Sequence, residues 1–175
     1  MSPTNFWVVF LIALVPLAVG ALYYSKPLFG NAWQKTVGLS DADMAEANML
    51  KIFGLTYVYS IFVTTFLMIV VIHQTSLSGL FGMLPEFAEE GSALWADLNM
   101  LDDKYELFTK HRHFGHGVFH GGLFGLLFLG PLISINALFE RRNWKYMAIN
   151  TGYWTICLAL IGGLLCQFLD FSFYQ

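Results

Sequence analysis

The residue type in this chain best suited to chemistry is histidine, which occurs five times and in only two regions of the sequence. One histidine follows a long apolar stretch and four lie at the start of another: His73, then His111, His113, His116 and His120. The last three are spaced by three and four residues, so a helix would carry them on one stripe. Imidazole nitrogens bind Zn, Cu, Fe or Ni, and histidines four residues apart can chelate one ion. The pattern therefore marks His73, His113, His116 and His120 as candidate ligands of a metal ion, beside the interpretation of the histidines as ordinary interfacial residues.

Three other interpretations of these histidines stay open from sequence. Histidines at a membrane surface are often ordinary amphipathic residues whose rings reach water. A haem needs ligands on facing helices, and His73 opposite His116 or His120 is the pair to test. Carboxylates such as Glu106 or Asp170 would instead raise a histidine pKa and make the cluster sensitive to pH. A shared ion requires the His73 ring to lie within about 12 Å of His116 or His120, because metal–nitrogen bonds are about 2 Å long.

No other pattern in the chain indicates catalysis. The metalloprotease, serine-hydrolase and phosphate-loop motifs are absent from the sequence. The two cysteines, Cys157 and Cys166, would lie about 13 Å apart on nearly opposite faces of one helix, so they cannot pair with each other. We expect both to be packing residues and the protein to be non-enzymatic.

The elements that position these histidines are four apolar stretches, at residues 6–24, 52–72, 114–139 and 146–168. About 20 apolar helical residues match a hydrocarbon core of about 30 Å. The composition agrees, with 57% hydrophobic and 12% charged residues. The sequence predicts an all-α polytopic membrane protein, one domain over residues 1–175 that forms a bundle of four transmembrane helices.

The distribution of lysine and arginine predicts the orientation of this bundle. Six basic residues flank the first and third connections: Lys26, Lys35, Lys51, Arg141, Arg142 and Lys145. The long second connection carries three, among seven acidic residues. Because basic residues favour the cytoplasmic side, both termini and the histidines are expected outside the cytoplasm.

The connections contain helical signals of their own. Ser40 and Asp43 form an N-cap signature, from which a helix is expected over residues 41–72 without a break. The outer loop, residues 74–112, has apolar residues at three- and four-residue spacing in its first half. That pattern fits helical segments in the membrane interface or a lid over the bundle. From Asp102 the helix is expected to continue into the third span.

Small residues in the last two spans predict close helix packing. They are Gly117, Gly121 and Gly125 in the third span and Gly152, Ala159 and Gly163 in the fourth. Such stripes let backbones approach, either inside the bundle or across a homodimer seam. Pro16 and Pro131 are expected to kink their helices.

Several segments in both halves of the chain match one known family. They are residues 20–30 (GALYYSKPLFG) with Trp33, residues 136–142 (NALFERR) and residues 150–154 (NTGYW). On these the chain resembles the bacterial membrane family called domain of unknown function 1761. The resemblance implies a four-helix architecture in the bacterial plasma (inner) membrane, and no activity.

Three functions compete at this stage. The glycine-rich spans favour an oligomeric or accessory subunit that packs against partner helices, either a homo-oligomer or part of a membrane complex. The histidines favour a protein that binds a transition metal or haem. The kinked spans leave a small-solute channel or uncoupled transporter as a further alternative. A net charge of −3 gives no basic face for nucleic acid.

Overall fold

The computed structural model describes residues 5–170, and all regular structure in that range is helical. Three helical runs have the length and composition to cross a membrane: Met49–Val71, Phe114–Phe139 and Trp144–Phe168. A shorter apolar run covers Trp7–Tyr23. The expected all-α architecture is thus present, with three long apolar helices and a shorter one as candidate membrane spans.

The shorter run is divided into two helices, α1 (Trp7–Ile12) and α2 (Val15–Tyr23). Pro16 lies in the first turn of α2 and has no N–H to donate to the carbonyl of Ile12, so the regular helix is interrupted before it. Seventeen residues at about 1.5 Å each span about 26 Å, slightly less than a hydrocarbon core. A fourth crossing by this segment stays a prediction.

The first connection contains α3 (Gly30–Val37) and α4 (Asp41–Ala45), and the long helix α5 (Met49–Val71) follows. Ser40 and Asp43 form a complete capping box at the start of α4, which confirms the predicted N-cap. The expected unbroken helix over 41–72 is wrong. Asn48 begins a new helix, because its side chain accepts the Lys51 N–H at 3.0 Å.

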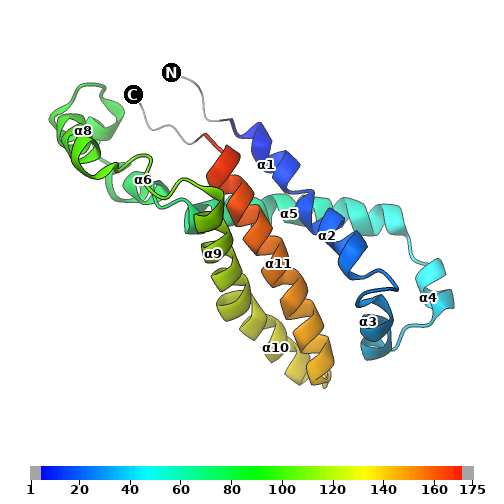
Figure 1. Cartoon of the computed structure of the whole chain (residues 1–175). Coiled ribbons are helices and arrows are strands. Elements are labelled where there is room, and N and C mark those ends of the chain that lie inside the picture. Colours follow the sequence, from blue (N-terminus) through cyan, green and yellow to red (C-terminus); the bar gives the residue numbers. More distant parts are fainter. Residues whose placement is uncertain (1–4, 171–175) are drawn as a thin grey trace.

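The second connection forms a small helical unit of its own. It contains α6 (Thr75–Phe81), α7 (Pro85–Ala88) and α8 (Ala93–Tyr105). These helices enclose a separate apolar cluster of Leu77, Phe87, Trp95 and Leu98. In Figure 1, α8 projects to one side of the helices that follow.

The helix expected to run from Asp102 into the third span ends at α8, so that expectation is wrong. Glu106 adopts a left-handed conformation, with φ of 57°. The Asp102 carboxylate accepts the N–H of Phe108 at 2.7 Å and so stabilises a turn in place of a further helical turn. A non-helical stretch of chain therefore carries His111 to the third span.

The third span is an uninterrupted run of α9 (Phe114–Phe124), a π-helical turn η1 (Gly125–Leu129) and α10 (Gly130–Phe139). Pro131 lies in the first turn of α10 and removes one backbone donor, and the departure from α geometry falls just before it. The disturbance expected at this proline therefore takes the form of a π-helical turn.

The last candidate span is α11 (Trp144–Phe168), which contacts all the other candidate spans. Half of its most apolar window is buried, against 22% and 17% for the other two long spans, so α11 is the central helix. Figure 1 shows α9 and α10 along one side of α11, while α5 crosses behind at a steep angle.

Glycines bring α9 and η1 against α11 within the chain. A Cβ at Gly117 would overlap the carbonyl of Gly162, and one at Gly121 would overlap the carbonyl of Leu158. A Cβ at Gly125 would lie 2.7 Å from the Cα of Thr155. The backbones therefore approach too closely for any side chain at these positions.

The remaining small residues of α11 contact several different neighbours. The Cα of Ala159 lies 3.2 Å from a Cβ built on Gly121, so Ala159 belongs to the same seam. Gly163 accommodates the ring of Phe114, and Gly152 instead faces the hydroxyl of Tyr23 on α2. These contacts lie between helices of one chain.

Candidate metal centre

The histidines meet where α5 ends and α9 begins. α5 ends at Val71, its C-cap Ile72 turns to an extended conformation, and His73 follows directly. His113 is the N-cap of α9, and its Nδ1 accepts the His116 N–H at 3.2 Å. The cap fixes the start of α9 so that His116 and His120, one turn apart, lie on the same side.

His73, His116 and His120 form a compact group. The Nε2 atoms of His73 and His116 are 3.0 Å apart. The ring centre of His73 lies 4.9 Å from both His116 and His120, and those two are 4.4 Å from each other. One ligand nitrogen from each of the three lies within 4.8 Å of the others. The 12 Å condition for a shared ion is therefore met, and the second and third spans are neighbours here.

His113 does not belong to that group, although the sequence predicted a set of four. It lies instead with His111 and His116, whose ligand nitrogens also fall within 4.8 Å of one another. His111 stacks on His116 with ring centres 4.7 Å apart. Helical spacing placed His111 outside the stripe of the other histidines. The sequence gave no signal for its position, because a turn, and not a helix, places its ring beside His116.

Polar side chains fix this turn in place. The buried Gln74 donates its amide to the carbonyl of Leu107 at 3.2 Å and to that of Lys110 at 2.9 Å. The Arg112 guanidinium donates to the carbonyl of Leu169 beyond α11. Sequence reasoning missed Gln74, for which the only signal was a polar residue next to His73.

The electrostatic environment of His73 is set by burial and by other histidines. Burial lowers its pKa, and the nearby His120 and His111 lower it further. The expectation that Glu106 or Asp170 would raise the pKa is wrong for His73, because neither carboxylate acts on it. Asp170 instead accepts a hydrogen bond from the Asn5 amide at 3.2 Å.

The spacing of the nitrogens suits neighbouring ligands of one small ion. Two nitrogens bound to tetrahedral zinc at about 2.0–2.1 Å are about 3.3 Å apart, so the 3.0 Å between His73 and His116 needs little adjustment. Haem iron holds axial nitrogens on opposite sides, about 4 Å apart with a porphyrin between them. The 3.0 Å between the His73 and His116 nitrogens is shorter than that spacing, so the arrangement fits a small ion more closely than a haem.

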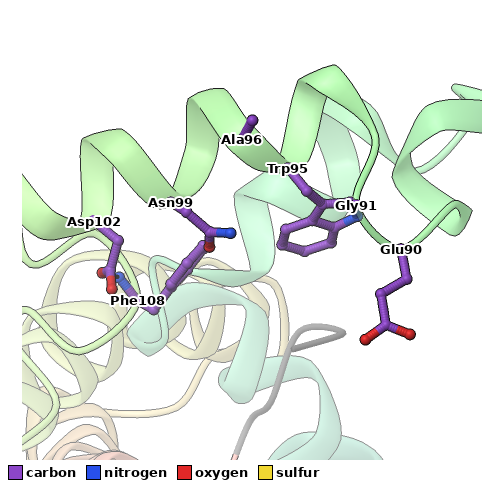
Figure 2. A pocket seen from close by; sticks show the side chains of 7 residues that line it. All are labelled: Glu90, Gly91, Trp95, Ala96, Asn99, Asp102 and Phe108. Atoms are coloured by element: carbon purple, nitrogen blue, oxygen red, sulfur yellow. Dashed lines mark hydrogen bonds between the residues drawn. The ribbon is translucent and has the colours of Figure 1, made fainter.

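A hollow of about 420 Å³ opens elsewhere, beside α8 (Figure 2). Its walls include Glu90, Trp95, Asn99 and Asp102. The Trp95 indole donates to the carbonyl of Phe87 at 3.0 Å, and Asp102 holds the turn described above. These polar groups stabilise the loop, and none of the five histidines lines the hollow.

The fold and the cluster together define an all-helical protein with candidate membrane spans and a group of histidines at the junction of two of them. The chain belongs to the family described as "Protein of unknown function (DUF1761)", whose model matches residues 7–166. This match confirms the resemblance found in the sequence. No curated protein and no solved structure matches the chain.

Proposed function

We propose that this protein is a membrane protein that binds a divalent transition-metal ion through His73, His116 and His120. The observation that carries the proposal is the convergence of three imidazoles from two separate apolar helices, with the closest nitrogens 3.0 Å apart. Two of the rings come from α9 and one from the end of α5, so the group depends on the tertiary fold.

The chemistry of the donors supports an ion of the zinc, copper or nickel type. Neutral imidazole prefers these ions, whereas calcium and magnesium prefer oxygen ligands. The lowered pKa of His73 keeps its nitrogen unprotonated and available at neutral pH. Three imidazoles leave a fourth tetrahedral position for water or for a ligand from a partner.

The test uses full-length protein purified in detergent without chelator. Elemental analysis should find close to one zinc, copper or nickel ion per chain, or the metal-free protein should take up one Zn²⁺ in titration. His116→Ala should lose this ion, while Leu127→Ala, at an exposed position two turns beyond His120, should retain it. Stoichiometric binding that survives His116→Ala would refute the proposed ligand set.

The proposed location is the bacterial plasma membrane, with both termini and the histidines outside the cytoplasm. The six basic residues of the first and third connections support this orientation. A reporter enzyme that is active only outside the cytoplasm should be active when fused after Gln175. The same reporter inserted in the third connection, after Arg142, should be inactive, and the reverse pattern would overturn the orientation.

One argument for an oligomeric or accessory subunit is weakened by the packing of the glycines. The glycines that suggested a homodimer seam meet α11 of the same chain. That role and the alternative of a solute channel stay predictions. Crosslinking in native membranes tests the first, and liposome flux assays test the second.

A further inference from the structure

A second histidine group overlaps the first and shares one member with it. His111, His113 and His116 bring their ligand nitrogens within 4.8 Å of one another, as His73, His116 and His120 do. His116 is therefore common to an inner group, which contains His73 and His120, and an outer group, which contains His111 and His113.

The two groups differ in their access to water. His111 and His113 are exposed, so two of the three outer rings face water. In the inner group only His73 is exposed, while His116 and His120 are half-buried. An open hollow of about 270 Å³ lies at the junction, and its lining includes His73, His111, Lys110 and Tyr105. An ion arriving from solution through this hollow meets His111 and His73 at the surface.

We propose that His111, His113 and His116 form a second metal-binding group, and that a divalent transition-metal ion passes between the outer and inner groups while it stays bound to His116. This inference rests on the proposed function, since it concerns the same class of ion. The outer group captures the ion from water, and the inner group retains it.

Because the two groups share His116, only one of them can hold an ion at a time. A neutral imidazole has one nitrogen with a free lone pair, so His116 holds one ion at a time. In the outer group the His113 Nδ1 must exchange the His116 N–H for the ion, and the stacked His111 ring must turn so that its nitrogen points at the ion. Transfer then replaces His111 and His113 by His73 and His120, with water filling open positions. No bond to a second metal forms, and the ion is never released.

The backbone around His111 supports a functional role for its position. His111 adopts a left-handed conformation with φ of 67°, a region in which histidine is more common than most residues other than glycine. The hydrogen bonds of Gln74 to Lys110 and of Arg112 to Leu169 hold the residues on either side of it. The turn therefore keeps the His111 ring against His116.

The test compares an outer-group variant with an inner-group variant in detergent-purified full chain. The outer variant combines His111→Asn, because asparagine tolerates a left-handed backbone, with His113→Ser, because serine preserves the N-cap of α9. The inner variant is His120→Ala, and Thr109→Ala in the same turn is the control. Zn²⁺ stoichiometry is measured by titration, and the rate of Zn²⁺ loss to excess EDTA is measured by stopped flow.

Wild type and both variants should bind one Zn²⁺ per chain. Exchange should slow at least about tenfold in the outer variant, which corresponds to about 1.4 kcal/mol in the barrier, because the exit through His111 and His113 is lost. The inner variant should release Zn²⁺ faster than wild type. Two ions per wild-type chain, or an outer variant that exchanges Zn²⁺ at the Thr109→Ala rate, would overturn the transfer. Absence of any binding in wild type would overturn the proposed function as well, so the two failures are distinguishable.

Discussion

His73, just beyond the end of α5, and His116, in the first turn of α9, face each other with their Nε2 atoms 3.0 Å apart. They are 43 residues apart in the sequence. At this distance the two nitrogens share either a proton or a metal ion. We therefore expect protonation or metal binding at this pair to control the stability of the junction between α5 and α9.

We first predict that His116 is the most sensitive ligand, because it belongs to both groups. His116→Ala should weaken Zn²⁺ binding by more than about 100-fold, beyond the effect of losing a supporting residue. His111→Asn alone should leave the affinity within about tenfold of wild type, because the inner group is intact. Equilibrium titration of the purified variants checks both values. Equal losses in the two variants would contradict this ranking.

The metal-free protein should lose stability in acid. The folded-state pKa of His73 lies below its unfolded value of about 6.5, so between these two pH values the unfolded state binds more protons. Stability should therefore fall as pH drops through about 6.5 and level off below the folded pKa. Thermal unfolding in detergent at pH 7.5 and pH 5 checks the sign.

Zn²⁺ should counteract this loss, and His73→Gln should reduce the dependence on pH. Zinc binds only unprotonated imidazole, so its stabilising effect should itself weaken as pH falls. A melting temperature that rises on acidification would contradict this prediction. It would show that nearby carboxylates raise the pKa of the histidines, so that protonation stabilises the folded state.

Gln74 should act as a positioning residue for the turn that carries His111. Gln74→Leu keeps the approximate shape but leaves the carbonyls of Leu107 and Lys110 without this donor, at a cost of about 1–3 kcal/mol. Proteolysis between residues 106 and 112 should accelerate, and Zn²⁺ exchange should change with it. Ser78→Ala, at an exposed site on α6, is the control and should alter neither.

The α9–α11 seam should distinguish two adjacent glycines. Gly121→Ala places a methyl group against the Leu158 carbonyl and should destabilise the protein by about 1–3 kcal/mol. Gly122→Ala meets only the Ala159 methyl at 3.7 Å and should be close to neutral. Thermal unfolding in one detergent compares the pair, and equal melting temperatures would argue against the seam.

The all-helical class and the candidate membrane spans were predictable from the sequence alone. Apolar length predicts the spans, since a bilayer fixes how many helical residues are needed to cross it. Local signals also predicted the capping box at Ser40 and a disturbance at Pro131, because caps and prolines act within one turn. The stripe of His116 and His120 followed from helical spacing alone.

Tertiary structure alone decided which histidines meet. Sequence periodicity describes one helix at a time, so it grouped His113 with His120 and set His111 aside. The turn after α8 reverses this grouping, because Asp102 and Gln74 bind its backbone and return His111 to His116. Whether small residues pack within a chain or between chains is likewise decided by which backbone lies opposite, and at Gly117 that backbone is Gly162.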